Sequence, residues 1–159
     1  MQMHIIKKEN KERNIFSDHT RIINEIERSL EIYNWKFILS FLPADSFLVG
    51  GYIRDLILGK LNPPIDVDIV VPKSAIEIGK KIAKNFQGKL IILDQRREIV
   101  RIIFKHIAID IASQISPSIE SDLLKRDFSI NSIAFSFDEK LLIDPFNGLK
   151  DIQLSLIHI

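Results

Sequence analysis

The chain has 159 residues, of which 46% are hydrophobic and 27% charged, with six Gly, six Pro and no Cys. This composition predicts one folded domain with its own core. It excludes disordered, collagen-like and disulfide-stapled proteins, and also thiolate catalysis and Cys-based zinc sites. The net charge of +1 neither requires nor forbids a nucleic-acid partner. Because no apolar run reaches the ~20 residues of a membrane span and no signal peptide is recognisable, we expect a cytoplasmic protein without a membrane partner.

The first part of the chain predicts a flexible end followed by one helix. Residues 1–19 are polar and aperiodic, which indicates a flexible N-terminal segment. From Thr20 to about Leu39 the apolar residues recur at helical spacing, and Asp18 or Thr20 is suited to the N-cap. We therefore expect a single amphipathic helix that packs on the core.

Next, the pattern alternates between strands and helices. Gly50-Gly51 follows a short apolar run, and β-branched and apolar residues mark a second strand before a helical stripe begins. The predicted order is a strand at 47–49, a helix at 52–58 closed by Gly59, a strand at 65–71, and a helix from a capping box at 74–77 to Gly88.

The second half predicts mainly antiparallel strands, because its apolar runs are joined by short polar turns. The predicted elements are strands at 90–93, 99–104 and 107–111, a helix opened by 116–118 and running to about Arg126, a hairpin of 132–137 with 141–143, and a turn at 145–148. Together these elements predict a mixed α/β (α+β) domain with a mostly antiparallel sheet of about five strands and helices on one side.

Asp66-Val67-Asp68 is the sharpest chemical pattern. Side chains at i and i+2 of a strand share one face, so the two carboxylates lie ~6.6 Å apart. Their repulsion is relieved where a divalent cation bridges them, and carboxylate oxygens suit Mg²⁺. The alternative is a solvated strand face without function.

Gly50-Gly51 before a helix is the second pattern. Without Cβ atoms, the backbone N–H groups of such a turn can approach a phosphate, and Arg54 can reach its oxygens while Asp55 orients Arg54. A glycine pair can equally be only a tight turn. The strand order places this pair beside Asp66 and Asp68, which favours a phosphate site next to a metal site.

The residues alone leave the roles of two further groups open. Asp110 in its apolar strand either faces solvent or is held inward by a partner, and a shared metal would be such a partner. In the segment 125–131, which contains a buried-looking Phe128, Arg126 can clamp a phosphate or stack on a base, and Asp127 and Asn131 can bond a ribose or a base edge. Alternatively, these cations only complement a helix C-terminus.

Four ordered blocks resemble the head domain of class II tRNA nucleotidyltransferases, the CCA-adding enzymes, and of bacterial poly(A) polymerases. The blocks are Leu48–Gly59, Asp66–Val70, Asp122–Ala134 and Asp144–Asp151. The resemblance implies the polymerase-β-like nucleotidyltransferase fold and the transfer of C or A from CTP or ATP to the 3′ end of tRNA. It also leaves open a poly(A) polymerase, an A-only or CC-only transferase, or a nucleotide-binding module without activity.

The resemblance also implies roles for particular residues. The triphosphate is assigned to Gly50, Gly51 and Arg54, the catalytic metals to Asp66 and Asp68, and the incoming nucleotide to Arg126, Asp127 and Asn131. Lys125 stands where the family usually has a second Arg, which replaces a planar fork by a point charge.

Finally, the resemblance implies boundaries. We expect the head domain over residues 20–153, without the neck, body and tail domains of the family, of which the neck selects the base. Residues 154–159 resemble the translation of a sequencing adapter, and we expect them to be a non-native tail. The alternative is that these residues are the genuine hydrophobic end of the next helix.

Overall fold

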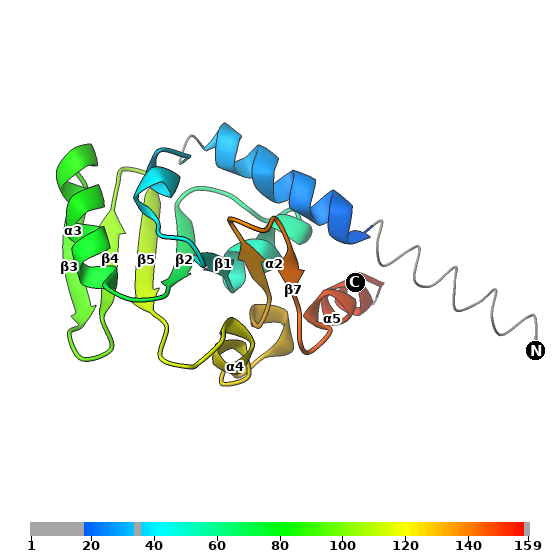
Figure 1. Cartoon of the computed structure of the whole chain (residues 1–159). Helices are drawn as coiled ribbons and strands as arrows, with labels where there is room; N and C mark the ends of the chain where they lie inside the picture. The colour runs from blue at the N-terminus through cyan, green and yellow to red at the C-terminus, as the bar shows by residue number, and fades with distance from the viewer. Residues whose placement is uncertain (1–17, 34–35, 158–159) are drawn as a thin grey trace, which may run out of the picture.

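The computed structural model describes residues 18–33 and 36–157, and the side chains up to Leu154. Within these residues seven strands form one sheet in the order β3-β4-β5-β2-β1-β6-β7 (Figure 1). The strands are β1 Phe47–Val49, β2 Ile65–Val71, β3 Lys89–Asp94, β4 Ile99–Ile103, β5 Ile107–Ser113, β6 Ala134–Ser136 and β7 Leu142–Ile143.

The pairing confirms a mixed, mostly antiparallel sheet. Only β2 and β5 pair in parallel, while the other neighbouring strands of the described residues are antiparallel. The sheet is larger than the expected five strands because the hairpin of β6 and β7 joins it through β1. The predicted bounds of β1 and β2 agree with the structure.

Most of the helices pack on the core face of the sheet. The helices of the described residues are a helix over residues 18–32, η1 Lys36–Phe41, α2 Gly51–Ile57, α3 Ala75–Phe86, α4 Ile119–Leu123, η2 Ser129–Asn131 and α5 Gly148–Ile157. Alternate side chains of β2, β4 and β5 form the main core with the N-terminal helix, α2, α3 and α5. In contrast, α4 packs a smaller cluster on Val49 and Val70, so the helices do not all lie on one side.

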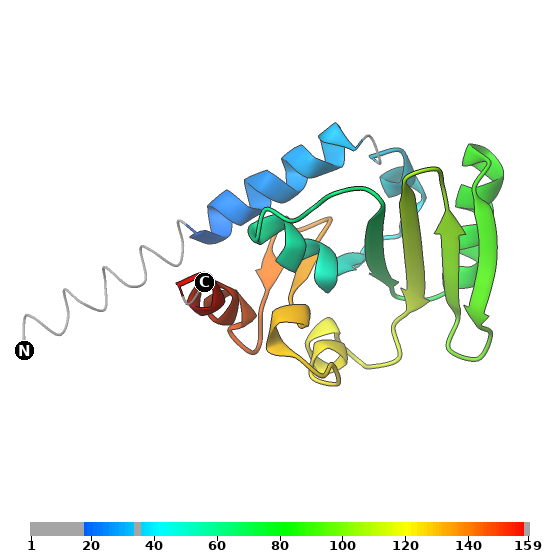
Figure 2. The same cartoon turned by 180° about the vertical axis from the view of Figure 1, so that it is seen from behind.

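The opposite face of the sheet positions the site. Figure 2 shows β2, β5, β4 and β3 from behind, with α3 on their far side and none of the drawn helices in front of them. Along β2, Ile65, Val67 and Ile69 are buried, whereas Asp66 is exposed and Asp68 half-buried. The polar residues of β2 therefore face away from the core.

The N-terminal helix is shorter than predicted. Instead of one helix over 20–39, the structure has a helix over 18–32 and a separate 3-10 helix η1, and residues 34–35 lie outside the described part. Both segments bury apolar side chains in the same core. Of the predicted flexible segment 1–19, residues 18 and 19 are helical and the others lie outside the described part.

The predicted capping box at the start of α3 is wrong. Ser74 has a left-handed φ of 63° and its side chain accepts no capping hydrogen bond. Instead, Glu98 accepts from the backbone N–H of Ser74 at 3.1 Å, and the hydroxyl of Ser113 accepts from that of Ala75 at 3.1 Å. Side chains from the turn before β4 and from the end of β5 therefore cap this helix.

Helix α5 contains part of the segment expected to be a non-native tail. It runs to Ile157, with Leu149 and Ile152 buried, while Leu154 is 45% exposed. Residues 158–159 lie outside the described part. Of the described residues, no helix is long and apolar enough to span a bilayer.

We predict that deleting residues 154–159 changes the melting temperature by no more than a few degrees. Among the α5 residues whose side chains the structure describes, the buried ones are Leu149 and Ile152, both upstream of the deletion, and ~1 kcal/mol corresponds to about 2–4 °C in a domain of this size. Thermal unfolding followed by circular dichroism measures this. A much larger drop would show that the segment packs as native sequence.

Candidate active site

The carboxylates of β2 stand in line with polar residues of the neighbouring strands. Asp68 pairs in register with Asp110 of β5, and Asp110 pairs with Arg101 of β4. Since neighbouring residues of paired strands project to the same face, this row crosses three strands on the face away from the core. Asp66 lies two residues before Asp68 on the same face, as the alternation predicted.

The environment of Asp68 disfavours its negative charge. Its pKa is raised above the ordinary value of 3.8, first by burial and then by the charges of Asp110 and Asp66, while Arg126 and Arg101 act in the opposite direction. The carboxylates are therefore crowded, and a cation beside them would stabilise the ionised forms.

Asp110 has a protein partner. Arg101 donates from Nε to one oxygen of Asp110 at 2.7 Å and from a terminal nitrogen to the other at 2.8 Å, a bidentate pair. The same pair raises the pKa of Arg101 further above its ordinary range. Of the two readings left open for Asp110, the structure thus shows a carboxylate held by a partner, which is Arg101.

The glycine turn brings the backbone of Gly50 close to the side chains of Arg126 and Asp68. Gly50 has φ 76° and ψ −138° and donates from its N–H to the carbonyl of Ile133 at 3.2 Å. A Cβ at this position would lie 3.3 Å from a terminal nitrogen of Arg126 and 3.4 Å from a carboxylate oxygen of Asp68. The expected closeness of the glycine pair and the carboxylates is therefore present in the structure.

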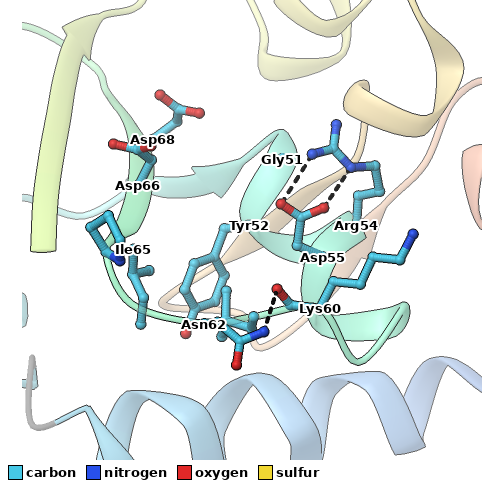
Figure 3. A pocket seen from close by; sticks show the side chains of 11 residues that line it. Gly51, Tyr52, Arg54, Asp55, Lys60, Asn62, Ile65, Asp66 and Asp68 are labelled. Atoms are coloured by element: carbon cyan, nitrogen blue, oxygen red, sulfur yellow. Dashed lines mark hydrogen bonds and ion pairs between the residues drawn. The ribbon is translucent and has the colours of Figure 1, made fainter. Parts of the chain in front are cut away.

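Arg54 is fixed by two partners at the start of α2. It donates to the two oxygens of Asp55 at 2.8 and 3.0 Å and to the side-chain oxygen of Asn131 at 2.6 Å. The expected orientation of Arg54 by Asp55 is thus observed. Figure 3 shows this pair beside a cavity of about 200 Å³, with Gly51, Asp66 and Asp68 also lining it.

The segment after α4 supplies the remaining cations. Arg126 approaches Asp122 at 3.9 Å, and its Nε is a buried donor without a hydrogen-bond partner among the described residues. Lys125 donates to the hydroxyl of Ser116 at 2.9 Å, and Asp127 is exposed. The expectation that Phe128 is buried is wrong, since it is 64% exposed. The helix predicted to reach Arg126 ends at Leu123, so Phe128 lies beyond it. The backbone carbonyl of Phe128 accepts hydrogen bonds from the N–H of Asn131 and the hydroxyl of Ser132.

The site therefore combines crowded carboxylates, a glycine turn and two arginines. Residues 46–158 match the model of the family described as the poly A polymerase head domain. The chain belongs to this family. The match confirms the resemblance noted in the four sequence blocks and the expected fold class.

Relatives of this head domain are tRNA nucleotidyltransferases. A CC-adding tRNA nucleotidyltransferase of Synechocystis sp. is 43% identical over 117 residues, covering 74% of this chain and 28% of the relative. An A-adding tRNA nucleotidyltransferase of Aquifex aeolicus is 32% identical over 135 residues, covering 72% of this chain and 16% of the relative. The chain thus spans less than a third of the length of these curated relatives.

Solved structures agree with this family. A complex of a CCA-adding enzyme with CTP is 37% identical at a TM-score of 0.59, covering 68% of this chain and 26% of that chain. A tRNA nucleotidyltransferase with a primer tRNA and an incoming ATP analog is 31% identical at the same TM-score of 0.59, covering 68% and 33%.

In this head domain the fourth sequence block holds the third in place. Asp144 accepts from the N–H groups of Gly148 and Leu149 at 2.7 and 3.0 Å and so caps α5. Gly148 packs directly on the carbonyl oxygen of Ser129, leaving no space for a Cβ. Asp151 accepts from the Ser129 hydroxyl at 2.6 Å. These contacts fix η2, which carries Asn131.

Neither Arg101 nor the supporting role of the fourth block was predicted from the sequence. The signal for Arg101 was a single arginine inside the apolar strand 99–103, opposite the single aspartate of the next strand. Since a cross-strand ion pair depends on register, it could be recognised only by aligning the two strands.

Proposed function

We propose that this head domain catalyses nucleotidyl transfer from CTP, ATP or both to the 3′ end of tRNA. The observation that carries this is that the side chains of Asp68 and Arg126 both approach Gly50. This places an anion-binding guanidinium beside crowded carboxylates. The relatives named as CC-adding, A-adding and CCA-adding enzymes support the same reaction class.

In this proposal the residues act mainly by positioning and charge. Arg54 and Arg126, with the backbone of Gly50 and Gly51, hold the triphosphate through charge-assisted hydrogen bonds. Asp127 and Asn131 contact the nucleoside. Asn131 does so while its side-chain oxygen holds Arg54, which couples the nucleoside contact to the triphosphate contact.

Nucleotidyltransferases generally use divalent metal ions, and we propose Mg²⁺ held by Asp66 and Asp68. Among the described residues no group of three Asp, Glu or His side chains is placed to hold a metal ion, and Mg²⁺ is commonly bound through one or two carboxylates plus substrate phosphates. The donor set therefore fits. The bound ion would neutralise charge on the α-phosphate of the transferred nucleotidyl group and on the leaving pyrophosphate.

We also propose Asp110 as a catalytic residue because of its position. It stands beside Asp68 in the parallel pair of β2 and β5, and the Arg101 pair holds its side chain on the face of Asp68. The charge of Asp110 raises the pKa of Asp68 and so increases the attraction of this site for a cation.

Two other functions use the same site. The family description covers poly(A) polymerases, so a head that adds A to other RNA ends is an alternative. The near-neutral net charge of +1 favours weak RNA affinity and hence a nucleotide-binding module, since Lys and Arg contacts to phosphates dominate RNA binding. The cytoplasmic location stays a prediction.

An incorporation assay tests the proposal. The full 159-residue chain is incubated with Mg²⁺, labelled CTP or ATP, and tRNA that lacks its 3′ CCA. Titrations of labelled tRNA and of ATP at two salt concentrations accompany it. Metal-dependent extension of the tRNA supports the proposal. Nucleotide binding without extension identifies a binding module, and extension of unrelated RNA with A alone identifies a poly(A) polymerase.

A further inference from the structure

A second cavity shares Arg126 with the carboxylate site. It has a volume of about 830 Å³ and contains four cationic side chains, from Arg96, Arg97, Lys125 and Arg126, against the two carboxylates of Glu98 and Asp122. We call it the basic cavity. Its remaining lining residues are Ser113, Gln114 and Ile115. The chain as a whole has a net charge of +1, so this excess of cations is local.

The cations of the basic cavity are poorly neutralised by the protein. Lys125 is bonded to a neutral serine hydroxyl, and Arg97 approaches Asp94 only at 3.9 Å. Arg96 has no ion pair among the described residues, and Arg126 retains its buried unpartnered Nε. Since a buried donor is normally hydrogen-bonded, an anionic ligand would supply what these side chains lack.

The turn between β3 and β4 is built to present its arginines. Asp94 accepts from the backbone N–H groups of Arg96 and Arg97 at 2.9 and 3.0 Å, which fixes the turn. Figures 1 and 2 both show this turn at the same end of the sheet as α4. Residues from two distant parts of the chain therefore face one cavity.

Arg126 connects the basic cavity to the reaction site, because it also lies over Gly50 beside Asp68. A transfer reaction of the proposed kind needs two substrates at these carboxylates. The attacking and leaving oxygens lie roughly in line, on opposite sides of the transferred phosphorus. The nucleotide is assigned to Arg126 and to the smaller cavity, which Gly51 and Arg54 line. Arg96 and Arg97 line only the basic cavity, which leaves them for the second substrate.

We propose that the basic cavity binds the phosphodiester backbone of the RNA strand whose 3′ end is extended, with Arg96 and Arg97 as phosphate contacts. This inference rests on the proposed function. A polynucleotide suits the cavity because its phosphates repeat along the strand, and four cations spread over a turn and a loop can contact more than one of them.

The test measures RNA binding against salt concentration, with a fluorescent single-stranded oligoribonucleotide and no nucleotide present. The variant is Arg96→Ala/Arg97→Ala. The matched control is Lys81→Ala/Lys84→Ala, which removes two charges from the exposed side of α3, away from the basic cavity. The slope of log K against log salt is negative, and each lost phosphate contact reduces its magnitude by about 0.7 for a single strand.

We expect the arginine variant to reduce the magnitude of this slope by about 1.4. It should keep the affinity for ATP and the melting temperature of the unaltered chain. The lysine variant should keep the slope. An equal change in both variants would overturn the proposal in favour of a general charge effect. A loss of ATP affinity in the arginine variant, with the RNA slope kept, would overturn the proposal and show that the cavity binds the phosphates of the nucleotide instead. RNA binding too weak to measure at low salt would also overturn it. Because no nucleotide is present, the slope reports on the cavity even in a chain without transfer activity.

Discussion

Replacing Asp68 by Asn is expected to abolish Mg²⁺-dependent nucleotide binding, with a loss of at least about 100-fold, because it removes one of the two carboxylates proposed to hold the ion. The fold should remain intact or become slightly more stable. Burial and the charges of Asp110 and Asp66 raise the pKa of Asp68, so its ionised form is disfavoured in the folded state. Isothermal titration with ATP, with and without Mg²⁺, and thermal unfolding measure the two effects.

The pH dependence of stability gives a second reading of the same substitution. Between the ordinary pKa of 3.8 and the higher pKa in the folded protein, folded Asp68 binds more protons than unfolded Asp68. Its contribution to the free energy of unfolding therefore falls as pH rises through that window. The asparagine side chain of the variant does not titrate there. Asp68→Asn should thus remove this part of the pH dependence, and the variant should be at least as stable at neutral pH.

Glu77→Gln is the matched control for Asp68→Asn, since Glu77 carries one exposed negative charge on α3 and pairs with Lys80 at 3.2 Å. It should leave nucleotide binding unchanged. If Asp68→Asn unfolded the protein, Asp68 would be a structural residue. If it bound Mg²⁺ and ATP normally, the metal assignment to β2 would be wrong.

Gly50→Ala is expected to impair both stability and nucleotide binding. At φ 76° and ψ −138° an L-residue is strained, which costs about 1–3 kcal/mol. The new Cβ would also stand 3.3 Å from Arg126, which must shift by a few tenths of an ångström, and 3.4 Å from Asp68, an ordinary contact distance. We expect a fall in melting temperature of several degrees and at least a tenfold loss of ATP affinity, measured by thermal unfolding and titration.

Gly59→Ala separates the backbone strain of Gly50→Ala from its effect on the site. Gly59 also has a positive φ, of 65°, but a Cβ there would have open space around it. This control should lose about 1 kcal/mol of stability and keep its ATP affinity. Equal behaviour of the two variants would show that the close approach of Gly50 to Arg126 and Asp68 has no role in binding.

The local parts of the fold could be predicted because they depend on short-range periodicity. The strand 65–71 and the turn at Gly50-Gly51 follow from β-branched residues, from alternation and from backbone freedom that only glycine has. The same alternation placed Asp66 and Asp68 on one face. The four sequence blocks then identified the family, which the family match confirmed.

Only the tertiary structure decided the contacts between segments far apart in the sequence. The bidentate pair of Arg101 and Asp110 depends on the register of two strands. The cap of α3 comes from Glu98 and Ser113, although the local sequence offered Ser74. Such contacts were beyond sequence analysis because helix and strand periods fix which face a side chain takes, whereas the packing of the elements fixes what lies opposite it.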